Sequence, residues 1–132
     1  MSLSKSLIGV LRQMTQSSEL LTPAGKEAAQ RFFDQMEQTL SPGEYVRELT
    51  YAEAMKYFKT DVPRHQKATQ GVIMRKATSR KIHVIQVFLD ANDEVIPQVN
   101  NDKLPYGRQL FAERLDQELD EAFGSANVIL VK

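Results

Sequence analysis

The chain has 132 residues, of which 42% are apolar and 26% charged, proportions that are ordinary for one globular domain and argue against global disorder. It has no cysteine, which excludes a disulfide framework, a thiolate nucleophile and a cysteine-ligated metal. No apolar run approaches the ~18 residues of a membrane span, so we expect a cytoplasmic protein without a membrane partner.

Charge is balanced overall but not along the chain. The 17 basic and 17 acidic residues give a net charge of zero, which argues against a protein built mainly to coat nucleic acid. Residues 55–83, however, hold eight lysines or arginines and one acid, whereas residues 84–124 hold nine acids and three bases. A basic segment is therefore followed by an acidic one.

The N-terminal part is predicted to be mainly helical. Apolar residues at helical spacing predict a first helix over residues 4–18. They are Leu7, Ile8, Leu11 and Met14. Thr22 and Pro23, a capping hydroxyl and a proline at the first helical position, begin a second helix that continues to Leu40.

A third helix is expected after Thr50, because Thr50 and Glu53 have the spacing of a capping box. It ends near Lys59, before a polar and basic loop. Ser41–Glu44 has the same spacing and favours one or two further helical turns before this helix.

Strands are predicted over residues 72–77, 81–89 and 94–99. The second is apolar on both faces, which is typical of a central strand covered on both sides. Pro97 cannot donate a hydrogen bond to a ladder, so the third strand belongs at an edge.

Residues 106–123 have apolar side chains at helical spacing and are expected to form a long helix that ends at Gly124. A last apolar strand follows over residues 127–131, and we expect it to lie beside the first strand. The predicted fold is one α+β domain over 1–132, with N-terminal helices followed by a mostly antiparallel four-stranded sheet made of a β-meander, a crossover helix and a final strand. Residues 1–60 are its mainly helical part, and residues 71–132 form the sheet and crossover helix.

Thirteen residues are predicted to form most of the core. They are Phe32, Phe33, Met36, Phe58, Val84, Ile85, Val87, Phe88, Phe111, Leu115, Leu119, Val128 and Leu130.

The basic segment contains the first candidate site, because a loop and a hairpin tip can present several cations to a phosphate backbone. The candidate anion or nucleic-acid contacts are Arg64, Lys67, Arg75, Lys76, Arg80 and Lys81. The alternative is a solvated hairpin whose cations meet the acidic helix face at residues 113–121, and that alternative is favoured because charge runs usually mark solvated faces.

The second candidate site is a small-anion site at the expected helix start, where Tyr106 and Arg108 flank a glycine. His65 and His83 lie on different elements and do not have the spacing of zinc ligands. No catalytic residue, metal or cofactor is therefore predicted, and an enzymatic function is the less favoured hypothesis.

We expect a non-enzymatic binding or adaptor module that acts through protein–protein interaction. The apolar stripe of the helix at 4–18 is surplus to one small core and is the expected interface of a homodimer or with a protein partner. One alternative is a nucleic-acid-binding protein that uses residues 56–81. Another is a small enzyme or ligand-binding protein with a pocket near 105–108.

Overall fold

The computed structural model describes residues 23–41, 43–124 and 126–131. The helix expected at residues 4–18, with the interface residues Leu7, Ile8, Leu11 and Met14, lies outside the described residues. The elements in chain order are α2 (Pro23–Thr39), β1 (Glu44–Leu49), α3 (Tyr51–Thr60), β2 (Gln70–Ala77), β3 (Ile82–Leu89), β4 (Pro97–Gln98), β5 (Asn101–Pro105), β6 (Gly107–Leu115), α4 (Gln117–Phe123) and β7 (Val128–Val131).

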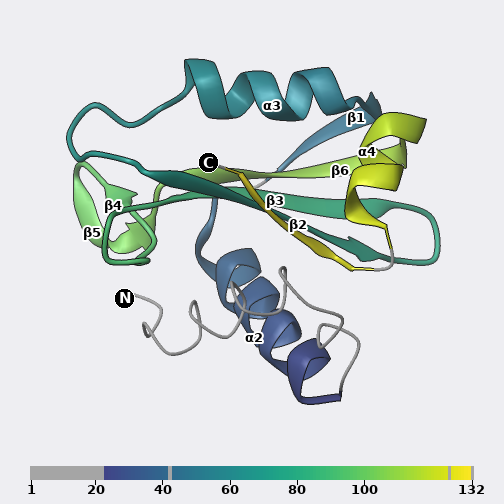
Figure 1. Cartoon of the computed structure of the whole chain (residues 1–132), viewed down its shortest axis with the longest axis horizontal. Helices are drawn as coiled ribbons and strands as arrows, with labels where there is room; N and C mark the ends of the chain where they lie inside the picture. The colour runs from purple at the N-terminus through teal and green to yellow at the C-terminus, as the bar shows by residue number, and fades with distance from the viewer. Residues whose placement is uncertain (1–22, 42, 125, 132) are drawn as a thin grey trace.

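A mixed five-stranded sheet with the order β1-β6-β3-β2-β7 forms the centre of the molecule. Strand β1 runs parallel to β6, and every other pair in this sheet is antiparallel. Strands β4 and β5 form a separate two-stranded ribbon at one end (Figure 1).

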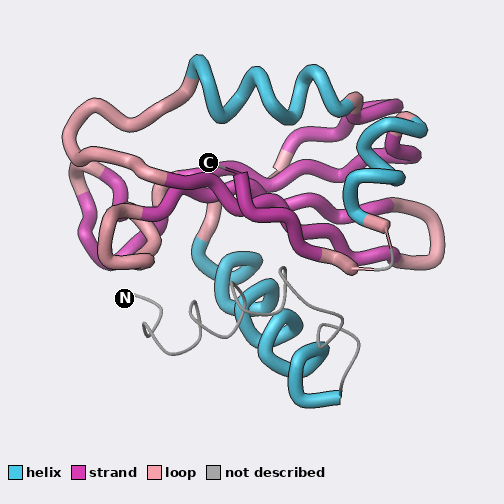
Figure 2. Tube along the Cα trace, in the orientation of Figure 1, coloured by secondary structure: helices cyan, strands magenta, loops and turns pink. Residues whose placement is uncertain are grey.

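Helices cover both faces of this sheet. Helix α2 lies below it in the view of Figure 2, and α3 and α4 lie on the opposite face. The side chains of β3 alternate between two apolar clusters, because successive residues of a strand point to opposite faces. Ile85, Val87 and Leu89 pack with α2, whereas Val84 and Phe88 pack with α3 and α4.

The predictions for α2, α3 and the β2–β3 hairpin are confirmed. Thr50 is the N-cap of α3, because its Oγ1 accepts a hydrogen bond from the Glu53 amide at 3.1 Å. The second half of the predicted capping box differs, since the Glu53 carboxylate accepts from the Thr50 hydroxyl at 3.3 Å. Strand β7 pairs with β2, as expected for the last strand. Strand β3 is central and covered on both faces, although its second cover is α3 with α4 and not a helix over 106–123.

The prediction of a four-stranded sheet with a long crossover helix is wrong. Residues 107–115 form strand β6, and within the predicted helix of residues 106–123 the structure is helical over the seven residues of α4 alone. Strand β6 is inserted between β3 and β1, so its middle is buried on both faces. Apolar side chains on both faces of a strand can resemble a helical stripe, and ladder hydrogen bonds to two neighbours outweigh the local preference.

Two other segments also differ from the sequence prediction. Residues 44–49 form a strand beside β6 and not helical turns. In the segment 94–99, only Pro97–Gln98 belongs to a strand, and Val95 makes an isolated bridge to Leu89. Pro97 lies outside the five-stranded sheet, which agrees with its missing backbone donor.

Of the thirteen predicted core residues, ten are buried. Phe111, Leu115 and Leu130 are partly buried, and of these only Leu130 lies on an edge strand, β7.

Candidate ligand-binding cleft

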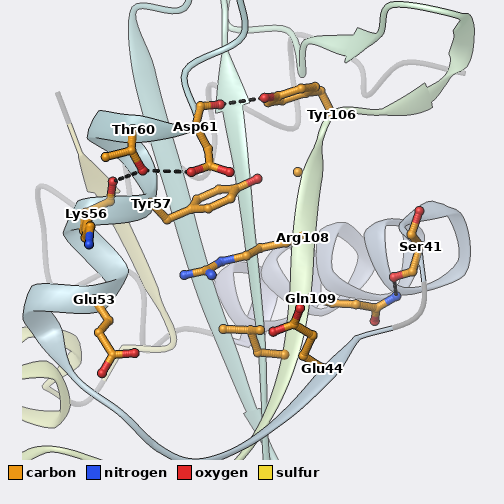
Figure 3. A pocket seen from close by; sticks show the side chains of 12 residues that line it. Ser41, Glu44, Glu53, Lys56, Tyr57, Thr60, Asp61, Tyr106, Arg108 and Gln109 are labelled. Atoms are coloured by element: carbon orange, nitrogen blue, oxygen red, sulfur yellow. Dashed lines mark hydrogen bonds between the residues drawn. The ribbon is translucent and has the colours of Figure 1, made fainter.

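An open cleft of about 730 Å³ lies between α3 and the first half of β6. Its size is in the range of small-molecule sites, which is roughly 300–1,000 Å³. The lining residues are Ser41, Glu44, Glu53, Lys56, Tyr57, Thr60, Asp61, Tyr106, Gly107, Arg108, Gln109 and Leu110. Figure 3 shows the Arg108 side chain extending across this space, below the Tyr57 ring.

Arg108 is placed in the cleft by the register of β6 against β3. It lies directly opposite Gln86 on β3. Both side chains point toward α3, since their alternating neighbours Leu110 and Val84 belong to the cluster on that face. The strand pairing therefore brings the guanidinium and the amide together on one face of the sheet.

Gln86 is fully buried and connects three elements. Its Oε1 accepts a hydrogen bond from Arg108 Nε at 2.8 Å, and its Nε2 donates to the carbonyl oxygen of Ala54 on α3 at 2.9 Å. Both ends of the amide are thus satisfied, and the amide holds Arg108 by its Nε.

The terminal nitrogens of Arg108 are available to a ligand. In the described part of the chain, neither makes a hydrogen bond or an ion pair with another side chain. The guanidinium carbon lies 4.2 Å from the centre of the Tyr57 ring, which fixes the plane of the group by cation–π stacking. Arg108 is therefore held by a hydrogen bond from its Nε and by stacking of its guanidinium on Tyr57, and its terminal N–H groups remain available to a ligand.

Burial lowers the pKa of Arg108, while Tyr57, Asp61, Glu44 and Glu53 act in the opposite direction. The group stays protonated at neutral pH, since the ordinary value is far above 7. It is a positive charge in a half-buried site.

The two tyrosines of the cleft are neutral phenols. Burial, with Tyr106 as the next cause, raises the pKa of Tyr57 well above its ordinary value. Burial and Asp61 raise the pKa of Tyr106. The Tyr106 hydroxyl donates a 2.6 Å hydrogen bond to the backbone oxygen of Asp61, which ties the start of β6 to the end of α3.

Gly107 permits the close approach of β6 to β3 beside Arg108. A Cβ atom at this position would lie 2.3 Å from the backbone oxygen of Gln86 and 2.8 Å from Val87 Cγ1. No side chain fits there without moving the strand, and so glycine is required for the local geometry of the cleft.

Tyr106 and Arg108 do lie together in one cleft, but the reason given from the sequence was wrong. No helix begins here: Arg108 is the second residue of β6. Backbone amides of a helix N-terminus therefore contribute nothing, and the anion-binding capacity comes from the guanidinium. Sequence reasoning missed Gln86, Tyr57 and Glu53, although a glutamine inside a strand that is apolar on both faces is a signal that could have found Gln86.

The structure does not bring the predicted basic residues together in one patch. Arg64 and Lys67 lie in the loop before β2, and Arg80 lies in the turn after it (Figure 1). The eight residues of β2 place the loop and the turn at opposite ends of the strand, ~26 Å apart at ~3.3 Å per residue.

Three of the hairpin cations already face partners within the chain. Arg75 donates to Asp120 at 2.6 Å and to the oxygen of Gly124 at 3.0 Å, with its guanidinium over the Phe123 ring. Lys76 lies 3.9 Å from a carboxylate oxygen of Asp34 on α2.

The third of these cations is Lys81, whose ammonium group lies over the Tyr45 ring. Arg80 is exposed. Within the described residues, it has no ion-pair partner.

The two histidines lie in different environments. His83 is buried, and its ring nitrogens lie 2.7 Å from Gln109 Oε1 and 3.0 Å from Glu37 Oε2. It is therefore satisfied within the fold, on the α2 face and away from Arg108. His65 is exposed and bonds the oxygen of Pro97 at 2.7 Å.

No cluster of metal-binding side chains occurs among the described residues. Within the same residues, every helix is too short or too polar to span a membrane. Comparison with family models, curated proteins and solved structures finds no match to this chain.

Proposed function

We propose that this protein is a small-ligand-binding domain whose cleft captures an anionic group on Arg108. The observation that carries the proposal is the half-buried guanidinium, held by Gln86 and Tyr57, whose terminal donors have no partner among the described residues. Partial burial of a charge costs free energy, and a ligand carboxylate or phosphate would offset that cost with bidentate, charge-assisted hydrogen bonds.

The way in which Arg108 is held supports this proposal. An arginine whose terminal nitrogens both already donate to acceptors within the chain is a structural group, as Arg75 is through the Asp120 carboxylate and the Gly124 backbone oxygen. Among the described residues, Arg108 forms its hydrogen bond through Nε and stacks on Tyr57, and so the fixed orientation of its terminal nitrogens does not cost their hydrogen-bonding capacity. Preorganisation of this kind lowers the entropy cost of ligand binding.

The nucleic-acid alternative over residues 56–81 has weaker support. Its cations lie at both ends of β2, and Arg75, Lys76 and Lys81 already have partners within the chain. A continuous phosphate track would need cations along one face.

A binding titration tests the proposal. Nuclear magnetic resonance titrations with acetate, citrate, inorganic phosphate and a mixture of free amino acids should shift the amide signals of residues 56–61 and 106–110 in the wild type. Arg108→Gln should abolish those shifts, whereas Arg31→Gln, at an exposed position on α2, should retain them. The proposal is wrong if no probe shifts these signals, or if Arg108→Gln responds as the wild type does.

A further inference from the structure

We infer that the ligand of this cleft is a zwitterion, an α-amino acid or a short peptide, with its carboxylate on Arg108 and its ammonium group on the side of the cleft that carries Glu44 and Glu53. The inference rests on the proposed function and names the class of molecule that the cleft selects. It follows from the balance of charges around Arg108, from the accessibility of the carboxylates and from the shape of the remaining space.

The charges of the cleft are of both signs. Two cationic and three carboxylate side chains line it, so its formal charge is −1. Glu44, Glu53 and Asp61 all act electrostatically on Arg108, yet in the described chain none of them makes an ion pair with it. Figure 3 shows the carboxylates on different sides of Arg108, with Asp61 beyond the Tyr57 ring and with Glu44 and Glu53 on the other side of the guanidinium.

This arrangement discriminates between classes of anion. A doubly charged phosphate on Arg108 would be attracted by one guanidinium and repelled by three carboxylates, and like-charge juxtaposition in a partly buried site is costly. A zwitterion has no net charge, and its positive group relieves the repulsion that its negative group meets. Lys56 weakens this selection but does not reverse it, since the carboxylates remain in the majority.

The carboxylates are accessible to an ammonium group. Glu53 accepts one long hydrogen bond, at 3.3 Å, from the Thr50 hydroxyl, and Glu44 accepts none from the described residues. Asp61 accepts from the Thr60 hydroxyl at 2.8 Å through one oxygen, Oδ1. Each of the three retains acceptor capacity, and a carboxylate can accept up to about four hydrogen bonds.

The remaining surface suits an organic side chain. Tyr57 and Tyr106 present aromatic carbon with neutral hydroxyl groups, and Leu110 adds aliphatic carbon to the wall. A cleft of about 730 Å³ also has more room than an inorganic anion needs. The charged regions would orient the backbone of the ligand, and the tyrosines would contact its side chain.

Calorimetric titration with capped and uncapped ligands tests the inference. The probes are the twenty free amino acids and a set of dipeptides, each compared with its N-acetyl derivative and its C-terminal amide. At least one uncapped probe should bind, and removal of either charge by capping should weaken binding roughly tenfold or more, as expected for loss of a charge-assisted hydrogen bond.

Substitution of the cleft glutamates should change the affinities for two related ligands in opposite directions, which a structural defect would not do. Glu44→Gln combined with Glu53→Gln should weaken binding of the free amino acid but strengthen binding of its N-acetyl form, because only the zwitterion uses the carboxylates. Glu27→Gln, at an exposed position on α2, is the matched control and should change neither affinity.

The outcomes separate the two proposals. Equal binding of free and N-acetyl amino acids, or preference for inorganic phosphate or citrate, would overturn the zwitterion while leaving the anion-binding function in place. Absence of binding by every probe, with Arg108→Gln indistinguishable from the wild type, would overturn both. Both proposals are supported if binding requires both charges of the ligand and if the double variant prefers the N-acetyl form where the wild type prefers the free amino acid.

Discussion

Replacing Gln86 with leucine should destabilise the protein and loosen Arg108. The substitution keeps a similar volume but removes two hydrogen bonds, one from the charged Arg108 Nε and one to Ala54. Hydrogen bonds to charged groups contribute about 1.5–3 kcal/mol and neutral ones about 0.5–1.5 kcal/mol, and leucine regains some apolar burial, so we expect a loss of about 2–4 kcal/mol.

Urea denaturation of four proteins measures this effect. They are the wild type, Gln86→Leu, Arg108→Met and the double variant. Because the two side chains interact directly, their coupling free energy should be about 1.5 kcal/mol or more, since coupled pairs reach ~0.5–3 kcal/mol. Gln30→Leu, at an exposed position on α2, controls for a general effect of the substitution. A coupling free energy below about 0.5 kcal/mol would refute the view that Gln86 holds Arg108.

Three further predictions concern the sheet, the tyrosines and the hairpin. Gly107→Ala should destabilise the protein by about 1–3 kcal/mol through overpacking against Gln86, and an unchanged urea midpoint would contradict the close approach of β6 to β3. Burial raises the pKa of Tyr57 above 10, the ordinary pKa of a tyrosine. The stability that this shift provides is therefore fully present below pH 10. It is lost progressively above pH 10, because the unfolded chain then releases a proton that the folded chain retains. Thermal melts from pH 8 to 11 should therefore fall less steeply for Tyr57→Phe than for the wild type, and parallel curves would contradict this. Arg75→Met should lower the free energy of unfolding by about 1.5–3 kcal/mol in urea denaturation, because it removes charge-assisted hydrogen bonds to Asp120, Gly124 and Asn127. Arg80→Gln should change it by no more than about 0.5 kcal/mol. Equal effects of the two variants would show that the Arg75 contacts contribute nothing.

The contacts of Arg75, Lys76 and Lys81 also explain how a hairpin with two basic pairs is tolerated. Like charges close together on a hairpin destabilise it unless they meet anions or aromatic rings. Here Arg75 meets α4, Lys76 meets α2, and Lys81 lies over Tyr45 on β1. These cations therefore join the β2–β3 hairpin to both helical layers and to the far edge of the sheet.

Local patterns were sufficient to predict several elements from the sequence alone. The apolar stripe of α2, the N-cap Thr50 and the run of apolar residues in β3 each depend on neighbours within a few positions of the chain. A strand that is apolar on both faces must be covered on both sides, and β3 is central for that reason. The same reasoning paired β2 with β3 and predicted most of the core.

Only the tertiary structure decided the identity of β6 and the composition of the cleft. The spacing of Leu110, Phe111 and Leu115 fits a helix and also a strand with two buried faces, and periodicity cannot separate the two. The insertion of β6 between β3 and β1 supplies ladder hydrogen bonds on both sides, and its partner residues lie 20 or more positions away in the chain. The pairing of Arg108 with Gln86 depends on that register, since a slip of one residue would turn Arg108 to the α2 face and remove it from the cleft.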